Sequence, residues 1–146
     1  MNRQRRVLFL CTGNSCRSQM AEGLLRHLGR DRFGVFSAGT APKPVHSLAV
    51  RAMQEVGIDI SGQTSKSLDR FLNDRFDAVI TVCDRAKESC PVFRGGGERI
   101  HWGFDDPAEA IGTEEDRMRV FRRVRDEIRV KIEGFLGQEK DRRDIR

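Results

Sequence analysis

The stretch that decides the fold is Val7-Leu-Phe-Leu-Cys-Thr-Gly-Asn-Ser-Cys-Arg-Ser18, in which four apolar residues run directly into a polar loop. A short uninterrupted apolar run is typical of a strand that is buried on both faces of a parallel sheet. The turn-forming residues after Cys11 end this strand. From Ser18 onward, apolar residues return at helical spacing, at Ala21, Leu24, Leu25 and Leu28. The sequence therefore predicts a strand, a loop that begins at Cys11 and a helix that begins near Ser18.

The rest of the chain continues this alternation. We expect strands at residues 35–36, 78–82 and 100–102, helices at residues 49–56, 68–72 and 121–135, and a turn of helix between Cys83 and Pro91. Gly29 and Gly57 follow helical segments, and we expect Gly29 to end its helix in the left-handed conformation. Thr113 and Asp116 precede the last helix and resemble a capping box with Asp in place of Glu.

Alternating strands and helices predict an α/β fold in three layers, with a four-stranded, mainly parallel sheet and helices on both faces. Ligands of such sheets bind in the crevice beyond the carboxyl ends of the strands, where Cys11 lies. A chain of 146 residues has the usual size of one domain. We expect a single α/β domain over residues 1–138 and a charged, flexible tail over residues 139–146, where apolar periodicity stops.

The formal net charge of +5 suits an anionic ligand, but basic and acidic residues alternate along residues 114–127. This alternation is typical of a solvated helix face, so we do not expect nucleic-acid binding. The apolar run at residues 7–10 is too short for a secretion signal, and no apolar stretch is long enough for a membrane span. We expect a cytoplasmic monomer. Its four cysteines, Cys11, Cys16, Cys83 and Cys90, should then lie in a reducing compartment, where cysteines tend to be catalytic, redox-active or metal-binding rather than structural disulfides.

The loop Cys11–Ser18 combines a candidate nucleophile with an anion-binding site. A loop between a strand and a helix N-terminus directs several backbone N–H groups to one point, where anions bind. Arg17 lies six residues after Cys11, so its guanidinium can face the thiol and grip two oxygens of a tetrahedral oxyanion. The same positive groups favour the thiolate, which makes Cys11 the predicted nucleophile. The predicted oxyanion-binding loop comprises Thr12, Gly13, Asn14, Ser15, Cys16, Arg17 and Ser18.

We expect different roles for three residues of this loop. Ser18 is expected to donate its hydroxyl proton to the thiolate, and Asn14 to hold the loop shape through side-chain hydrogen bonds. Cys16 is expected to point away into packing. The alternative for the whole loop is a buried cysteine at a strand end with an unrelated surface arginine, but the Cys-x5-Arg-Ser spacing at a strand-to-helix junction favours the catalytic interpretation.

The loop, with Gln19-Met-Ala-Glu22 after it, resembles the signature of the low-molecular-weight tyrosine phosphatase superfamily. More narrowly, the chain resembles the thioredoxin-coupled arsenate reductases of that superfamily. The narrower resemblance rests on Ser37-Ala-Gly39, Thr81-Val-Cys83, Cys90-Pro91 and His101-Trp-Gly-Phe-Asp-Asp-Pro-Ala108. It extends over nearly the whole chain except the tail.

The resemblance implies an enzyme that reduces arsenate to arsenite, with phosphate or sulfate as competing oxyanions. It assigns the general acid to Asp106, which the following proline keeps out of the helical region. In the mechanism that the resemblance implies, Cys11 attacks arsenate, Cys83 attacks Cys11 and expels arsenite, and Cys90 then attacks Cys83, leaving a disulfide that thioredoxin reduces. Seven helical residues span roughly 10 Å, beyond the ~7 Å Cα limit for a disulfide, so the segment between Cys83 and Cys90 must unwind to close this bond.

Some members of the family bind a structural potassium ion, and the matching positions here are Asn14, Glu22, Ser37 and Thr64. A carboxylate expected two residues after Thr64 is replaced by Lys66. The Lys66 ammonium either takes the place of the cation and pairs with Glu22 or points to solvent. We therefore expect no cofactor, and weak or no potassium dependence. The spacing of cysteines and histidines does not favour a zinc site either.

Two other functions remain as alternatives. A phosphatase acting on phosphotyrosine or small phosphoesters would use Cys11, Arg17 and Asp106, but Ala108 and Glu109 stand where aromatic residues flank phosphoaryl pockets. Weak phosphatase side activity is also compatible with a reductase, because such a loop recognises tetrahedral oxyanions in general. A non-catalytic thiol sensor that uses the two later cysteines would leave the Arg17 loop unexplained.

Overall fold

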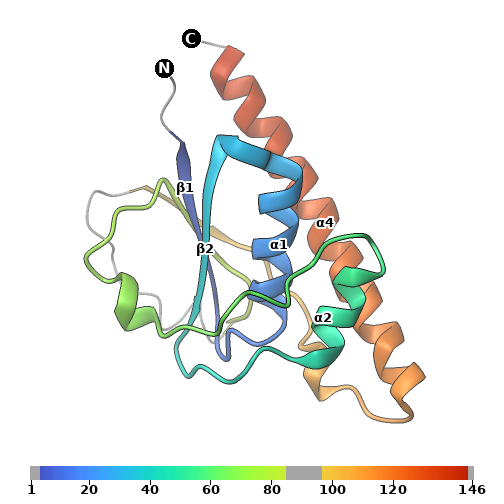
Figure 1. Ribbon diagram of the computed structural model, residues 1–146. Coiled ribbons are helices and arrows are strands. Elements are labelled where there is room, and N and C mark those ends of the chain that lie inside the picture. The colour runs from blue at the N-terminus through green and yellow to red at the C-terminus, as the bar shows by residue number, and fades with distance from the viewer. Residues whose placement is uncertain (1–3, 85–96, 145–146) are drawn as a thin grey trace.

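The computed structural model describes residues 4–84 and 97–144, with side chains up to residue 140. It contains four strands, three α-helices and three short 3-10 helices within these residues (Figure 1). In chain order they are β1 (Arg5–Cys11), α1 (Arg17–Gly29), η1 (Arg30–Arg32), β2 (Phe33–Gly39), α2 (Ser47–Gln54), η2 (Leu68–Phe71), β3 (Ala78–Thr81), β4 (Glu98–His101), η3 (Pro107–Glu109) and α4 (Glu114–Asp144).

The four strands form one parallel sheet in the order β2-β1-β3-β4. β1 lies in the interior of this order, and its residues 7–10 are fully buried. β2 and β3 pair with opposite edges of β1, so the strand order reverses at β1. In parallel sheets, a crevice forms at the carboxyl end of the strands at such a switch point, and Cys11 lies there. The predicted α/β class with a four-stranded parallel sheet is confirmed.

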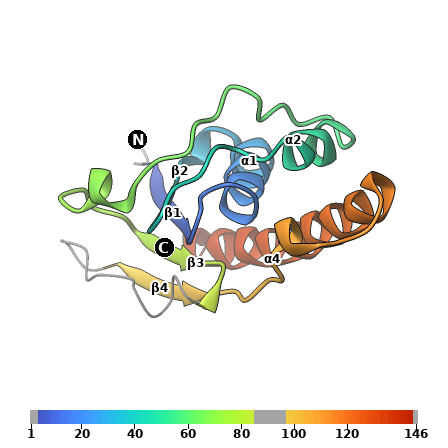
Figure 2. The ribbon, with the colours of Figure 1, turned by 90° about the horizontal axis from the view of Figure 1, so that it is seen from below.

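The two faces of the sheet are covered by different structures (Figure 2). Helices α1, α2 and α4 pack together on one face, where Phe9 contacts Trp102 at a ring-centroid distance of 6.2 Å. On the other face, Phe36 of β2 contacts Phe71 of η2 at 5.9 Å. Within the described residues, α-helices therefore cover one face and a 3-10 helix covers the other. The turn of helix predicted after Cys83 lies outside the described residues.

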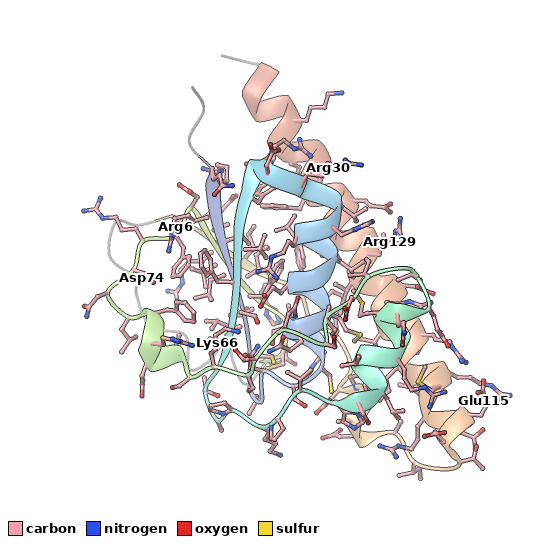
Figure 3. The ribbon with its side chains drawn as sticks, in the orientation of Figure 1. Arg6, Arg30, Lys66, Asp74, Glu115 and Arg129 are labelled. Atoms are coloured by element: carbon pink, nitrogen blue, oxygen red, sulfur yellow. The ribbon has the colours of Figure 1, made fainter. Side chains whose placement is uncertain are left out.

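Helix α1 ends as predicted at Gly29, but not in the predicted conformation. Gly29 has a φ of −88°, and the left-handed residue is instead Arg30, with a φ of 53°. Arg30 is labelled in Figure 3. The expectation for Gly29 was therefore wrong. Glycine is required there for space, because a Cβ at this position would lie 2.5 Å from the ring of Phe33. Gly57, in the turn after α2, does have a positive φ, of 78°.

Helix α4 begins with the predicted capping box and ends later than predicted. The Thr113 hydroxyl accepts a hydrogen bond from the Asp116 N–H at 3.1 Å, and the Asp116 carboxylate accepts one from the Thr113 N–H at 3.0 Å. The helix continues to Asp144, and Glu139 is buried and accepts a hydrogen bond from Arg5 at 2.8 Å. The prediction that a flexible tail begins at residue 139 was therefore wrong, because the local sequence gives no sign of the ion pair between Glu139 and Arg5 of β1.

No helix in the described part of the chain is long and apolar enough to cross a membrane.

Candidate active site

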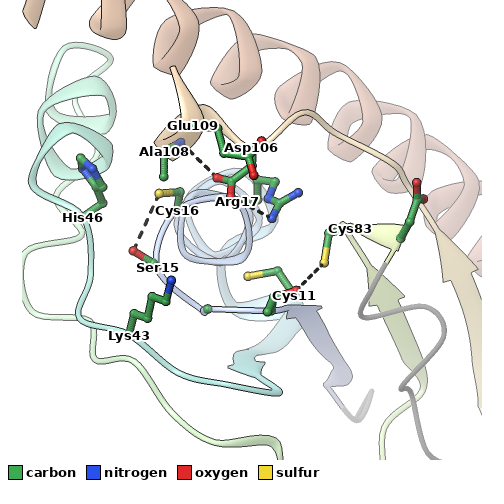
Figure 4. A pocket seen from close by; sticks show the side chains of 13 residues that line it. Cys11, Ser15, Cys16, Arg17, Lys43, His46, Cys83, Asp106, Ala108 and Glu109 are labelled. Atoms are coloured by element: carbon green, nitrogen blue, oxygen red, sulfur yellow. Dashed lines mark hydrogen bonds and ion pairs between the residues drawn. The ribbon is translucent and has the colours of Figure 1, made fainter. Parts of the chain in front are cut away.

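The candidate active site is a pocket of about 480 Å³ at the carboxyl end of β1 (Figure 4). It gathers residues that the sequence predicted from separate motifs, namely Cys11, Thr12, Gly13, Ser15, Cys16, Arg17, Cys83 and Asp106. Its wall is completed by Lys43, His46, Asp84, Ala108 and Glu109. Residues from four separate segments of the chain thus meet at one point, next to the strand end that the sequence identified.

Cys11, the last residue of β1, is only 2% exposed. The backbone N–H of Asn14 donates a hydrogen bond to the Cys11 Sγ at 3.1 Å, and the Ser18 Oγ lies 2.8 Å from the same sulfur. The Ser18 Oγ also accepts a hydrogen bond from the Asn14 side-chain amide at 2.8 Å, so its own proton is free to point at the sulfur. Two donors therefore converge on the Cys11 sulfur, an arrangement that suits a nucleophilic thiolate.

The backbone of the loop is turned so that its carbonyl groups face outward. The five carbonyl oxygens from Cys11 to Ser15 accept hydrogen bonds, in order, from the backbone N–H groups of Thr40, Ala41 and Lys43, the side-chain amide of Gln19 and the backbone N–H of His46. In a planar trans peptide, the C=O of one residue and the N–H of the next point in opposite directions. The N–H groups of residues 12–16 are therefore directed toward the inside of the loop, where they can bind an anion.

Close packing and a left-handed residue maintain this shape. Gly39 at the end of β2 allows the approach, because a Cβ there would lie 2.6 Å from the carbonyl oxygen of Thr12. Asn14 has a φ of 46°, which asparagine tolerates better than most residues. Its buried side chain makes the hydrogen bonds expected of it: it donates to Ser37 at 2.9 Å and accepts from the N–H of Lys66 at 2.8 Å.

Arg17 and Asp106 lie together at the mouth of the pocket (Figure 4). The Arg17 guanidinium donates to the carbonyl oxygen of Phe104 at 3.1 Å and lies 3.6 Å from an Asp106 carboxylate oxygen. Asp106 has an extended backbone before Pro107, as predicted, and its other oxygen accepts from the N–H of Ala108 at 3.0 Å. The guanidinium is thereby held at the pocket, with a carboxyl group beside it that can exchange a proton with a bound oxyanion.

Cys83 follows β3, the neighbour of β1, and lines the same pocket as Cys11. It is 5% exposed, and its Sγ lies 3.4 Å from the Thr12 hydroxyl. The parallel pairing of β1 with β3 is what brings these two cysteines, 72 residues apart, to the same end of the sheet. Cys90 lies outside the described residues.

Comparison with known protein families matches residues 6–144 to the family Low molecular weight phosphotyrosine protein phosphatase. The chain belongs to this family. The membership predicted from the loop signature is confirmed.

Relatives within this family include several bacterial proteins named arsenate reductase. Those of Halalkalibacterium halodurans and Bacillus subtilis are 53% and 50% identical over 129 residues, and each match covers 88% of this chain and 93% of the relative. An arsenate reductase structure in the oxidized state has a TM-score of 0.80 and 35% identity, covering 92% of this chain and 98% of that one. The thioredoxin-dependent arsenate reductase of Corynebacterium glutamicum has a TM-score of 0.71 and 28% identity, with 92% and 61% covered.

Cys16 shares the family loop with Cys11 but not its surroundings. It is 3% exposed, and burial is the main cause that raises the pKa of its thiol to about 12. Its Sγ has the Ser15 hydroxyl as a distant partner at 3.8 Å. A thiol that stays protonated is a poor nucleophile, so Cys16 fits the packing role expected from the sequence, although one side of it borders the pocket.

The positions that match the family's potassium site are joined by hydrogen bonds and an ion pair, and Lys66, labelled in Figure 3, takes part in them. The Lys66 side chain is 12% exposed, its Nζ lies 3.9 Å from a Glu22 carboxylate oxygen, and it donates to the carbonyl oxygen of Thr64 at 2.5 Å. The hydroxyl of Ser37 donates to the same Glu22 oxygen. Burial lowers the pKa of Lys66, and the Glu22 charge opposes this. The Lys66 ammonium therefore lies among oxygens at the positions that match the family's cation site.

The sequence interpretation missed His46, which lines the pocket on the side away from Cys83 (Figure 4). Its Nδ1 accepts a hydrogen bond from the N–H of Leu48 at 3.1 Å, so it caps α2, and its Nε2 lies 3.5 Å from the Arg117 guanidinium. Burial and the Arg117 charge lower the pKa of His46, while Asp106 opposes them. The sequence could have indicated that His46 caps α2, because it directly precedes that helix. It could not indicate that His46 lines the pocket, because this depends on how residues 40–46 run along the loop Cys11–Ser18.

The pair formed by Asp84 and His101 was also missed. The Nε2 of His101 lies 2.9 Å from the Asp84 carboxylate, and its Nδ1 lies 2.7 Å from the Thr81 hydroxyl. A carboxylate only accepts, so the Nε2 carries a proton in this arrangement. The position of Asp84 directly after Cys83 could have marked it as a site residue. Its partner His101 could not be found in this way, because it lies on the neighbouring strand β4.

Proposed function

We propose that this protein is an arsenate reductase that uses Cys11 as its nucleophile and Cys83 as its first resolving thiol. The observation that carries the proposal is the position of Cys83 in the same pocket as Cys11, next to the oxyanion loop. Ester hydrolysis needs one thiolate, whereas reduction of arsenic from As(V) to As(III) needs two electrons, which thiols supply in pairs. The relatives that are about half identical over most of the chain carry the name arsenate reductase.

In the first step, arsenate occupies the loop with its oxygens against the inward N–H groups and the Arg17 guanidinium. The Cys11 thiolate attacks arsenic, a sulfur–arsenic bond forms, and one oxygen leaves as water after taking up protons, one of them from Asp106. Asp106 is the candidate general acid because its carboxyl group lies at the pocket mouth beside Arg17. Arsenic remains As(V) at this stage.

In the second step, the Cys83 thiolate attacks the Cys11 sulfur. A Cys11–Cys83 disulfide forms as the sulfur–arsenic bond breaks, and its electron pair stays on arsenic, which leaves as arsenite. The two thiols are thereby oxidised and As(V) is reduced to As(III). The Cys90 thiolate then attacks Cys83, which releases Cys11 as a thiolate and leaves a Cys83–Cys90 disulfide.

Thioredoxin is the proposed reductant of that final disulfide. One similar structure is described as a thioredoxin-dependent arsenate reductase, and a dithiol protein of low potential is suited to reduce an accessible disulfide.

The test is arsenate-dependent NADPH oxidation by the purified protein with thioredoxin and thioredoxin reductase. We expect continuous turnover with both proteins present and at most one turnover when either is omitted. Turnover that proceeds equally with a small-molecule thiol alone would contradict the thioredoxin assignment. Absence of arsenite in every reaction would contradict the proposed function itself.

A weak phosphatase activity is proposed as a side reaction of the same pocket. The loop, Arg17 and Asp106 recognise and protonate oxygens of a tetrahedral anion, and none of these features distinguishes arsenic from phosphorus. A thiol sensor without catalysis is disfavoured, because it has no use for a general acid beside the oxyanion loop.

We also propose that catalysis needs no metal cofactor and depends weakly or not at all on potassium. The support is the Lys66 ammonium near Glu22, which supplies a positive charge at the position where a cation would act. Addition of potassium to a sodium-buffered assay should leave kcat/KM nearly unchanged.

A further inference from the structure

Gln19 is a fully buried polar residue in the first turn of α1 that does not line the pocket. Burial of a primary amide is costly unless each of its donors and acceptors has a partner. The surroundings of Gln19 satisfy this condition, and the partners show what the residue does.

The two N–H groups of the Gln19 amide donate to two backbone carbonyl oxygens, of Asn14 and of Thr64, each at 3.0 Å. Its Oε1 accepts a hydrogen bond from the side-chain amide of Gln63 at 2.7 Å. Carbonyl oxygens only accept, so this arrangement fixes which end of the Gln19 amide is nitrogen. Gln19 thus connects the oxyanion loop to the segment that contains Thr64.

The bond to Asn14 acts on a peptide that faces the oxyanion. The other four carbonyl oxygens of residues 11–15 are held by backbone N–H groups, whereas that of Asn14 is held by the Gln19 side chain. Asn14 has a φ of 46°, a conformation that is less populated for residues other than glycine. Rotation of the Asn14–Ser15 peptide would turn its carbonyl oxygen inward and its N–H outward, which would replace a donor to the anion by a repelling oxygen.

We propose that Gln19 is a positioning residue that keeps the Asn14–Ser15 peptide with its N–H toward the bound oxyanion and thereby sets the affinity of the loop for tetrahedral oxyanions. This inference rests on the loop being the oxyanion site of the proposed function. It concerns binding alone, so it is tested without arsenate reduction.

The experiment measures binding of inorganic sulfate, whose charge does not change near neutral pH, by calorimetry and by protection of Cys11 against alkylation. Gln19→Met keeps the length of the side chain and removes both donors, and we expect the Kd for sulfate to rise roughly tenfold, as the loss of one directed hydrogen bond to an anion would produce. Gln63→Met is the matched control. It removes the hydrogen bonds from Gln63 to Gln19 but leaves the loop carbonyl bonded, so its Kd should stay close to that of the wild type.

Gln19→Glu adds a readout that a purely structural role does not predict. The carboxylate cannot donate to the Asn14 carbonyl oxygen, but its protonated form can, so the ratio of its Kd to that of the wild type should fall as the solution is acidified. This variant also serves if Gln19→Met fails to fold.

Thermal melts of all variants separate stability from positioning. If Gln19→Met and Gln63→Met lose similar stability and only Gln19→Met loses affinity, the inference holds. If affinity is unchanged in Gln19→Met, or if it falls equally in both variants, Gln19 does not position the loop. If the wild type itself binds neither sulfate nor phosphate, the oxyanion loop and hence the proposed function are overturned as well.

Discussion

Cys11 and Cys16 lie five residues apart in one loop and are equally buried, yet their sulfurs have opposite surroundings. The Cys11 Sγ has the Asn14 N–H at 3.1 Å and the Ser18 hydroxyl at 2.8 Å. The Cys16 Sγ lies 3.8 Å from the Ser15 hydroxyl, and burial raises the pKa of its thiol to about 12.

The comparison shows that two cysteines of similar burial have different hydrogen-bond partners. Desolvation disfavours a thiolate wherever it acts, and in the proposed mechanism the donors beside the Cys11 sulfur oppose it. The Asn14 N–H points to the Cys11 sulfur because the carbonyl group of Gly13, in the same peptide, is bonded outward to Lys43.

Separate replacement of Cys11 and Cys16 should give the largest difference in arsenate reduction. Cys11→Ser removes the nucleophile, and we expect arsenate reduction to fall by on the order of 10⁴-fold or more. Cys16→Ala should keep most of the wild-type kcat, because a protonated, buried thiol takes no part in the chemistry. The measurement is arsenate-dependent NADPH oxidation. Equal losses in the two variants would show that the loop needs both sulfurs.

Cys83→Ser extends the comparison to a third cysteine. Sustained arsenate reduction should be abolished, since the thiol that expels arsenite is missing, whereas sulfate binding and any hydrolysis of p-nitrophenyl phosphate should be retained. Mass spectrometry of the oxidised wild type provides the control by locating the disulfide. A Cys83→Ser enzyme that still turns over arsenate would remove Cys83 from the mechanism.

Asp106→Asn should have a smaller but clear effect. Loss of a general acid costs ~10²-fold or more in kcat, while the amide keeps the size of the side chain. KM should change little, because Arg17 and the loop N–H groups still bind the anion. Glu109→Gln, at the same pocket, serves as the control. A large rise in KM with an unchanged kcat would indicate that Asp106 positions Arg17 instead.

The pKa of Cys16 also predicts a pH dependence of stability. The folded thiol stays protonated to about pH 12, while the unfolded thiol ionises near its ordinary value of 9.0. The unfolded state therefore binds fewer protons between these values, and the free energy of unfolding should fall by up to ~1.4 kcal/mol per pH unit as pH rises through this range. Denaturant unfolding of wild type and Cys16→Ala should show a steeper alkaline slope for the wild type. Parallel slopes would mean that Cys16 already ionises in the folded state.

The smallest expected effect concerns Lys66. Lys66→Asp removes the ammonium and adds a carboxylate among the Glu22 and Thr64 oxygens, so potassium should raise kcat/KM of this variant by a few fold and leave the wild type nearly unchanged. Assays in sodium and potassium buffers of equal ionic strength provide the measurement. A wild type that responds as strongly as the variant would contradict the proposed role of Lys66.

Much of the fold was predictable because its signals are local. The strand at residues 7–10, the helix after Ser18 and the capping box at Thr113 each depend on neighbours within a few residues, and the structure contains all three. Gly29 was assigned the wrong conformation because glycine is needed there for space and not for a left-handed backbone. The Phe33 ring occupies the place where a Cβ would lie. The start of the tail was wrong for the same kind of reason, since Arg5 fixes Glu139 across 134 positions.

By itself, the sequence determined the position of the predicted nucleophile Cys11, of the loop that follows it and of the arginine six residues later, because a strand end followed by a helix start places these groups within one short segment. Only the tertiary structure decided that Cys83 lies beside that loop, that Lys66 lies near Glu22, and that residues 40–46 turn the loop carbonyl groups outward. These contacts join segments distant in the chain, and they arise from the order in which the parallel strands pair, which no local pattern of residues encodes.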